Sequence, residues 1–467
     1  MKKTKIVCTL GPATASVEIM KKMIKAGMNV ARFNMSHGTH ESHLELINNL
    51  KRARAELGVP VAIMIDLKGP EIRIRQFENG SIMLQRGARF ILTTKNMVGT
   101  NEYVSVNYSR FPKVVTKGTR ILLNDGFVEL KVIDVNNDSV LTEVVVGGQL
   151  SNNKSINLPD VHVEMDFLSS MDKADLDFAK YVQADIISLS FVSSAKDVLD
   201  ARKYLDKIGF NDAIIISKIE NKFGVNDIDE ILAVSDGIMV ARGDMGVEIN
   251  YEKIPAIQKN LIALCKKHGK ISITATQMLE SMMYCPRPTR AEISDVANAC
   301  LDGSTCVMLS GETSAGNYPV ESIIAMGKII EDCEKELLNP VENLNCENQS
   351  VNTAIGLAAC DLSQSLNTSS ILVVTKSGEA ANSVSRFRPT ATIIACTPSE
   401  RVYYKLAALW GVVPIMDKEF NSIDELLASS KQKALATKLV KKGELFVEVA
   451  GVKAGESGIN FVRVEKY

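Results

Sequence analysis

The sequence predicts a (β/α)8 barrel that carries an inserted antiparallel β domain as a lid and is followed by a C-terminal α/β domain. Eight short apolar runs alternate with amphipathic helical stretches. About a hundred residues separate the third run from the fourth, far more than a simple connection needs. A polar segment, residues 339–350, then sets off a last group of strands.

The eight runs are rich in β-branched residues, and helical stretches such as Ser16–Ala26 follow most of them. Near-continuous apolar strands separated by helices are typical of parallel strands buried on both faces. Eight of them favour a closed barrel over residues 1–69 and 167–338. The strand count leaves a doubly wound open sheet as an alternative. The runs are Lys5–Leu10, Asn29–Asn34, Val61–Leu67, Asp185–Phe191, Ala213–Ile219, Gly237–Arg242, Ile271–Thr276 and Thr305–Ser310.

The long interval, residues 70–166, has the pattern of a hairpin-rich antiparallel sheet. Val128, Leu130 and Val132 alternate with charged residues, and turn signals occur at residues 124–126 and 147–148. A domain inserted into a βα loop lies over the mouth where barrel enzymes carry their chemistry. We therefore expect it to act as a lid.

Residues 339–467 are expected to form a third domain with its own core, suited to regulation or subunit contact. Its predicted strands are Ile371–Thr375, Thr392–Thr397, Val412–Ile415 and Leu445–Val449.

The composition is that of an ordinary globular protein, with 46% hydrophobic and 23% charged residues in a chain of 467. The net charge of −1 provides no field that would attract nucleic acid or an anionic membrane. No apolar run approaches the roughly 18 residues that span a bilayer. The N-terminus faintly resembles a signal peptide, but its apolar stretch is short and we interpret it as a strand. Nine cysteines without CxxC spacing predict free thiols and a cytoplasmic location.

Polar side chains gather at the carboxyl ends of the predicted barrel strands, at a spacing of two. Alternate residues of a strand share a face, so each set can point toward one mouth. In barrels that face carries the active site. A ring of ion pairs that merely closes the barrel is the structural alternative. The sets are Arg32, Asn34 and Ser36; Asp66 and Lys68; Lys218 and Glu220; Arg242 and Asp244; Thr274 and Thr276; Ser310 and Glu312.

Glu220 and Asp244 follow successive strands and offer hard oxygen ligands for Mg2+ or Mn2+. A salt bridge of Glu220 with Lys218 or Arg242 is the competing interpretation. Lys218, with Arg32 and Arg73, forms a cationic site for a small polyanion such as a phosphate ester. Thr276 and Ser310 are candidates for orienting water or a proton.

Several common motifs are missing or incomplete. The sequence contains no P-loop and no GxGxxG turn. His37, His40 and His43 recur at a spacing of three, but we favour a solvated helix start over a metal cluster there. Residue chemistry thus leaves three enzyme classes open: phosphoryl transfer, a Schiff-base aldolase that uses Lys218, and a metal-dependent lyase acting on an enolate. A barrel that serves only as a scaffold is a fourth possibility, against which the set of Lys218, Glu220 and Asp244 argues.

The strand-end residues lie in stretches that closely resemble pyruvate kinases, in the family's order and over nearly the whole chain. No single stretch decides the matter, but together they are highly specific. They are Lys5–Ala13, Ala31–Gly38, Asp66–Arg73, Ile216–Asn221, Met239–Gly246, Thr274–Ser281, Pro286–Glu292, Met308–Thr313 and Thr375–Gly378.

The resemblance implies transfer of phosphate from phosphoenolpyruvate to ADP, the last step of glycolysis, in a chain with barrel, lid and C-terminal domains that usually forms a homotetramer. It implies catalytic roles for Lys218, Thr276 and Arg32. Phosphoenolpyruvate would contact these three residues together with Gly243 and Asp244.

The resemblance also implies two cations and a nucleotide site. Glu220 and Asp244 would hold Mg2+ (or Mn2+), and a second Mg2+ would arrive with the nucleotide. The K+ ligands would be Asn34, Ser36, Asp66 and the backbone carbonyl of Leu67. The residues close to the nucleotide would be Pro12, Asn34, His37 and Arg73.

Departures from the family pattern concern the cations and the effector. Glu71 and Lys68 match K+-dependent members, whereas Leu67 and Ile74 lean the other way. The usual anion-binding Thr-x-Ser-Gly-Arg-Ser ends here in Glu379 and Ala380. The loop Gly451–Asn460 also differs from the common type. We therefore expect a sugar phosphate or nucleotide effector at the C-terminal domain, if there is one, to differ from fructose 1,6-bisphosphate.

Overall fold

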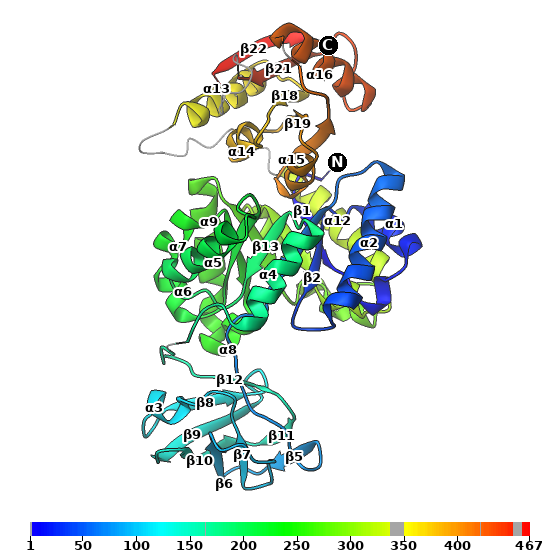
Figure 1. Ribbon diagram of the computed structural model, residues 1–467. Helices are drawn as coiled ribbons and strands as arrows, with labels where there is room; N and C mark the ends of the chain where they lie inside the picture. Colours follow the sequence, from blue (N-terminus) through cyan, green and yellow to red (C-terminus); the bar gives the residue numbers. More distant parts are fainter. Residues whose placement is uncertain (1, 164, 337–349, 421, 452–459) are drawn as a thin grey trace.

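The computed structural model describes residues 2–163, 165–336, 350–420, 422–451 and 460–467. The predicted linker before Ser350 and most of the loop Gly451–Asn460 lie outside these ranges. Figure 1 shows three units in a row: a barrel in the middle, a β-rich insert at one end and an α/β unit at the other. The predicted fold class is confirmed.

Eight parallel strands close the barrel in the order β1-β17-β16-β15-β14-β13-β3-β2. Their bounds are β1 Lys5–Thr9, β2 Val30–Asn34, β3 Ala62–Asp66, β13 Ile186–Leu189, β14 Ile214–Ile219, β15 Gly237–Ala241, β16 Ile271–Ala275 and β17 Cys306–Leu309. The longer surrounding helices are α1 Val17–Ala26, α2 His40–Leu57, α4 Ser170–Val182, α5 Ala195–Lys207, α7 Ile228–Val234, α9 Ile254–His268, α10 Arg290–Leu301 and α12 Pro319–Glu336. Short helices α6 Lys222–Asn226, α8 Arg242–Glu248 and α11 Gly311–Ser314 follow three of the strands.

Local sequence sets the ends of these helices. Thr39 accepts a hydrogen bond from the third residue of α2, and Ser169 does the same for α4. Gly27 and Gly58 end α1 and α2 in the left-handed region, which glycine enters without steric cost.

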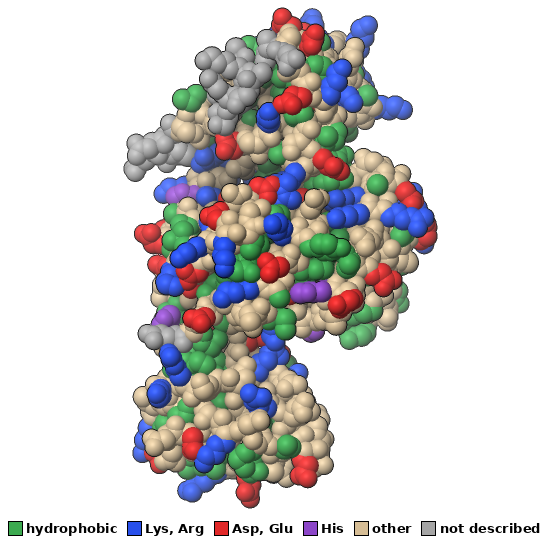
Figure 2. Space-filling view, viewed as in Figure 1, with side chains coloured by type: hydrophobic (Ala, Val, Ile, Leu, Met, Phe, Trp, Pro, Cys, Tyr) green, Lys and Arg blue, Asp and Glu red, His purple; other side chains and the backbone are tan. Residues whose placement is uncertain are grey.

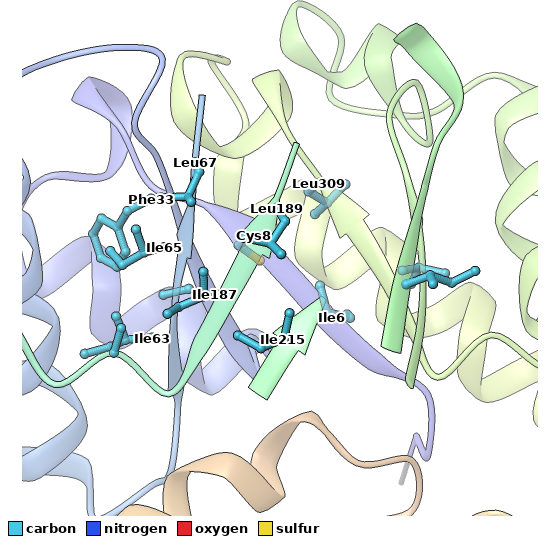
Figure 3. Close-up of a cluster of buried hydrophobic side chains, with 14 of the residues drawn as sticks. Ile6, Cys8, Phe33, Ile63, Ile65, Leu67, Ile187, Leu189, Ile215 and Leu309 are labelled. Carbon is cyan, nitrogen blue, oxygen red and sulfur yellow. The ribbon is translucent and has the colours of Figure 1, made fainter. Parts of the chain in front are cut away.

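Alternation along the strands separates two layers of the barrel. Phe33, Ile65 and Leu189 belong to the cluster shared with the helices, part of which Figure 3 shows. Residues of the other parity, such as Val7 and Met64, fill the interior. Their cluster continues into the core of the C-terminal unit, so the end of the barrel at the amino ends of its strands is apolar and closed.

The insert is built on a seven-stranded sheet of order β4-β12-β8-β9-β10-β6-β7 and a two-stranded sheet, β11-β5. Val128, Leu130 and Val132 of β9 are buried as the alternation predicts, and only the β6–β7 pair is parallel among the described pairs of the larger sheet. The elements are β4 Ile72–Arg73, β5 Ser81–Leu84, β6 Arg89–Thr93, β7 Tyr103–Ser105, α3 Phe111–Val114, β8 Arg120–Leu123, β9 Val128–Val135, β10 Ser139–Val146, β11 Gly148–Ser151 and β12 Ser155–Asn157.

The C-terminal unit is a five-stranded sheet of order β20-β19-β18-β21-β22. The four predicted strands are present, and a fifth, β22, runs antiparallel to β21 at the edge. The sequence analysis missed β22. The elements are α13 Val351–Ser365, β18 Ser370–Val374, α14 Glu379–Ser385, β19 Thr392–Thr397, α15 Glu400–Lys405, β20 Val412–Met416, α16 Ile423–Ala436, β21 Leu445–Ala450 and β22 Phe461–Lys466.

Candidate active site

Arg32 and Asp66 form a buried ion pair at the carboxyl ends of β2 and β3. Arg32 donates from Nε to Oδ2 of Asp66 over 2.6 Å and from Nη1 to Oγ1 of Thr9 over 2.9 Å. Asp66 is fully buried and Arg32 is 7% exposed. The spacing-of-two pattern therefore brought these two side chains to the same interior face.

Lys218 lies beside this pair, near the end of β14. Its Nζ donates to Oγ of Ser190 over 2.6 Å and lies 3.0 Å from Oε1 of Glu220 and 3.5 Å from Oδ1 of Asp66. Burial lowers the pKa of Lys218, but the charges of Asp66 and Glu220 outweigh it and raise that pKa above its usual value. The side chain is therefore a permanent ammonium at neutral pH.

Glu220 is fully buried and only partly satisfied. Its Oε2 accepts from the backbone N–H of Phe191 over 2.6 Å, whereas Oε1 receives no aligned hydrogen bond from the described residues. Burial raises the pKa of Glu220 above its usual value; the charge of Lys218 lowers it and that of Asp244 raises it. Asp244, in the first turn of α8, is thus close enough to act on the same carboxylate.

These carboxylates fit a hard divalent cation. Oε1 of Glu220 has the Lys218 ammonium at 3.0 Å but no aligned hydrogen bond from the described residues, and a bound cation would stabilise it further and lower the pKa of the carboxyl. No group of three or more His, Cys, Asp or Glu among the described residues is arranged to hold a metal. Glu220 and Asp244 would therefore supply two ligands and leave the remaining positions to substrate or water oxygens.

Thr276 follows β16 with a φ of 69°, which is unusual for a β-branched residue. Its Oγ1 accepts from the N–H of Gly243 over 2.9 Å and donates to the carbonyl of Ala275 over 2.6 Å. Arg242 also donates to the carbonyl of Thr276. Such over-determined strain is typical of residues whose exact placement matters for function.

Three of the strand-end residues lie elsewhere, so the expectation that they point into the mouth is wrong. Arg242 continues the outward parity of Val240 and binds Asp295 of α10 at 2.7 Å. Thr274 has outward parity too and hydrogen-bonds Ser304 at 2.7 Å. Glu312 accepts from backbone N–H groups, including that of Ser310 at 2.7 Å.

The proposed K+ ligands are brought together by the pairing of β2 with β3, which sets Asn34 opposite Asp66. Oδ1 of Asn34 accepts from the N–H of Ser36 over 3.1 Å. The carbonyl of Leu67 accepts from Oγ of Ser190 over 2.7 Å. Oxygen atoms of all four residues thus lie at two adjacent strand ends, although several already have protein donors.

The proposed nucleotide residues spread around the rim. Both Pro12, the first residue of a 3-10 turn after β1, and His37, in the loop after β2, are exposed. Arg73 lies on β4 of the insert, where it binds Oε2 of Glu71 at 2.7 Å and the carbonyl of Asn153 at 2.8 Å. Arg73 is thus held by the insert and is not in the buried group around Lys218.

The three histidines form a packed helix start. His40 lies 2.6 Å from Oδ1 of Asp175 and stacks on Phe178. A ring nitrogen of His43 hydrogen-bonds the carbonyl of His37 at 2.7 Å. These contacts fit the predicted helix start, although they are partly buried, which the prediction of a solvated start did not foresee.

Two residues that hold this group together, Thr9 and Ser190, were not predicted from the sequence. Ser190 touches Lys218 and the Leu67 carbonyl, and Thr9 touches Arg32. Both follow the same rule as the others, since Thr9 ends β1 and Ser190 comes two residues after the inward Ser188. A hydroxyl residue at the carboxyl end of a strand is the sequence feature that could have identified both.

A cleft of about 870 Å³ separates the barrel mouth from the insert. Arg73 and Asn157 line it from one side, and Asp244 and Glu248 from the other. Asn157 donates to Oε1 of Glu248 over 2.9 Å, and Lys222 binds Asp160 at 2.6 Å, so the insert is tied to α8 and α6. Figure 2 shows the molecule narrowing at this junction.

Comparison with known proteins matches both parts of the chain to one family. The family model "Pyruvate kinase, barrel domain" matches residues 1–323, and "Pyruvate kinase, alpha/beta domain" matches residues 353–465. A protein named pyruvate kinase from Clostridium acetobutylicum is 44% identical over 100% of this chain and 99% of its own length. Pyruvate kinases from Bacillus licheniformis and Staphylococcus aureus are each 45% identical over 98% of this chain and 79% of their own length. No helix of the described residues is long and apolar enough to cross a membrane.

Proposed function

The chain belongs to the pyruvate kinase family of phosphotransferases, and we propose that it transfers the phosphoryl group of phosphoenolpyruvate to ADP, giving pyruvate and ATP as the final step of glycolysis. The observation that carries this proposal is the buried group of Arg32, Asp66, Lys218 and Glu220 at the barrel mouth. Two fixed cations beside two carboxylates suit a reaction in which anionic charge moves but little covalent chemistry falls to the protein.

Lys218 is the proposed electrostatic catalyst. Its ammonium stays protonated and would stabilise the negative charge that develops on the transferring phosphoryl group and on the enolate left behind. Arg32, held in place by Asp66 and Thr9, would bind the phosphate. The N–H groups around Gly243 and the carboxylate of Asp244 would complete the substrate site.

Thr276 would help deliver the proton that converts enolate to pyruvate. Its hydroxyl is fixed by the Gly243 N–H and the Ala275 carbonyl, so its position at the mouth is set before substrate binds. Preorganisation of this kind lowers the cost of reaching the transition state.

Glu220 and Asp244 would hold Mg2+ or Mn2+, which supplies Lewis-acid neutralisation of the substrate's oxygens when bound. K+ would lie near Asn34, Ser36, Asp66 and the Leu67 carbonyl. Pro12, Asn34, His37 and Arg73 would contact the nucleotide; of these four, Arg73 lines the cleft between the barrel mouth and the insert, whereas the other three lie outside its lining. We divide the chain into the units 1–69 with 167–338, 70–166 and 339–467.

The properties of Lys218 disfavour the Schiff-base alternative. An amine nucleophile needs a lowered pKa, whereas the neighbouring carboxylates raise that of Lys218. A scaffold without activity is disfavoured because it would gain nothing from burying the charges of Asp66, Lys218 and Glu220 together at the barrel mouth.

A coupled assay tests the function directly. Pyruvate formation from phosphoenolpyruvate and ADP is expected in the presence of Mg2+, and chelation with EDTA should abolish it reversibly. Formation of pyruvate at the same rate after metal removal, or none under any condition, would refute the proposal.

The described cysteines are free thiols, which supports a cytoplasmic location. A homotetramer is proposed from the family alone.

A further inference from the structure

A small cavity lies between the C-terminal unit and the end of the barrel at the amino ends of its strands, opposite the active-site mouth. It measures about 20 Å³, enough for one water-sized occupant but not for a polyatomic ion. Four basic side chains line it, and no carboxylate of the described residues does: Lys266 and Lys270 from the barrel, and Arg386 and Arg388 from the segment after α14.

Arg388 is the residue on which the inference depends. Its Nη2 donates to the carbonyl of Gly303 over 2.9 Å and to Oγ1 of Thr305 over 3.1 Å. Its Nε and Nη1 are buried and have no hydrogen-bond partner among the described residues. A buried guanidinium donor left unpaired costs about 1–3 kcal/mol, so the site favours an occupant that accepts hydrogen bonds.

No carboxylate of the described residues forms an ion pair with Arg388, whose guanidinium lies 4.7 Å from the ring centroid of Trp410. Burial lowers the pKa of Arg388 to about 10, so it remains protonated at neutral pH. The thiols of Cys265 and Cys306 do not supply negative charge, because burial raises the pKa of each to about 12. Burial raises the pKa of Cys300 as well.

Among the described residues, the acids whose charges act on Arg388 and Lys270 are Glu334 and Asp236, and both already accept hydrogen bonds. Glu334 accepts from the N–H groups of Lys3 and Thr4 over 2.7 and 2.6 Å. Asp236 accepts from Ile215 and Arg202 over 2.8 and 3.1 Å. Burial also lowers the pKa of Lys270, whose Nζ donates to the carbonyl of Ser235 over 2.6 Å.

We propose that this cavity binds one halide-sized anion, chloride in ordinary salt, held by Arg388 and Lys270 between the barrel and the C-terminal unit. A water molecule would satisfy the free donors but not the positive charge, whereas an anion satisfies both. Chloride binding would therefore stabilise the contact between the two units.

Bromide provides a direct test, because its anomalous scattering distinguishes it from water. Crystals of the full chain soaked in sodium bromide are expected to show an anomalous peak within hydrogen-bonding distance of Nε or Nη1 of Arg388. A density there without anomalous signal, or bromide only at other sites, would overturn the proposal.

Thermal unfolding tests the same site in solution. At equal ionic strength and K+ concentration, the wild-type Tm should be about 2 °C higher in potassium chloride than in potassium isethionate. Arg388→Met, or Lys270→Met if the first variant does not fold, should lose that difference. Arg401→Met is the matched control, because Arg401 also joins the C-terminal unit to the barrel, through Asp212 and the Ala184 carbonyl. It should lower Tm in both salts and keep the difference. An equal chloride response in all variants, or stabilisation by inorganic phosphate but not by chloride, would contradict the inference.

Discussion

Nζ of Lys218 and Oε1 of Glu220 lie 3.0 Å apart, and the two residues are two positions apart at the carboxyl end of β14. The strand period of two places both on one face, and burial prevents water from separating them. The proposed catalytic cation and the proposed metal ligand are therefore positioned by a single strand, β14, whose geometry the barrel fixes.

Lys218→Met should retain the barrel and lower the phosphoryl-transfer rate by a factor of about 10²–10³ or more, because it removes the cation nearest the developing charge. Steady-state assays together with circular dichroism would check both points. Lys259→Met, on the exposed face of α9 where Lys259 pairs with Asp302, is the control and should keep full activity. Near-normal transfer by Lys218→Met, or a borohydride-trapped substrate adduct on Lys218, would contradict the assignment.

Fructose 1,6-bisphosphate should activate weakly or not at all. Glu379 is the first residue of α14 and is exposed, so it places negative charge where a doubly phosphorylated sugar needs donors. Ala380 is buried and offers no hydroxyl. Titration of the bisphosphate against ribose 5-phosphate, glucose 6-phosphate and AMP measures this. Micromolar activation by the bisphosphate alone would be the opposite result.

The enzyme should require K+. In the structure Glu71 pairs with Arg73 at 2.7 Å and lies 4.0 Å from Lys68, so this carboxylate belongs to the charge balance of the rim. Rates in potassium chloride should exceed those in tetramethylammonium chloride at equal ionic strength and saturating Mg2+. Chloride is present in both salts, so the comparison isolates the cation.

Glu71→Lys should remain active and lose the K+ requirement, because its ammonium replaces the missing cation. Equal wild-type rates in the two salts would remove the basis for a K+ site. A variant that keeps the requirement would show that Glu71 does not determine it.

Asp185 should make stability depend on pH. Burial raises its pKa to about 6, and its Oδ2 accepts from the N–H of Ile63 over 2.8 Å. The folded state thus holds the proton more tightly than the unfolded state. Protonated Asp185 therefore adds at most roughly 3 kcal/mol to the free energy of unfolding below about pH 4, and this stabilisation is lost as pH rises through 6. Asp185→Asn keeps an acceptor but cannot ionise, so its Tm should improve relative to wild type between pH 4 and pH 7.

Asp212→Asn is the control with the opposite sign. Burial raises the pKa of Asp212, but Arg401 and Lys405 outweigh it and lower that pKa. The stability that Asp212 contributes is present above its unfolded pKa and lost at lower pH, so the Asn variant should fall behind wild type as pH rises. Parallel Tm curves for wild type and Asp185→Asn would exclude the buried-carboxyl argument.

The sequence predicted the barrel, and the inward direction of several candidate-site side chains, because both depend on short-range periodicity. Lys218 and Glu220 were placed correctly since strand parity alone sets their direction. The same rule misplaced Arg242 and Thr274, because their inward or outward parity depends on which strand residues line the interior, and the sequence does not show that. β22 was missed because its mixed residues Phe461–Lys466 make an edge strand, whose exposure weakens any pattern.

The division of buried residues into clusters has a consequence for cooperativity. The insert has a core of its own, around Phe90 and Leu130, whereas the barrel interior shares one cluster with one face of the C-terminal sheet, the other face packing around Phe446. The insert is therefore expected to open locally to hydrogen exchange while the rest of the molecule keeps its packing. In contrast, the backbone amides of the barrel and of the C-terminal unit should become open to hydrogen exchange together. A ligand that stabilises either unit should therefore slow amide exchange in both.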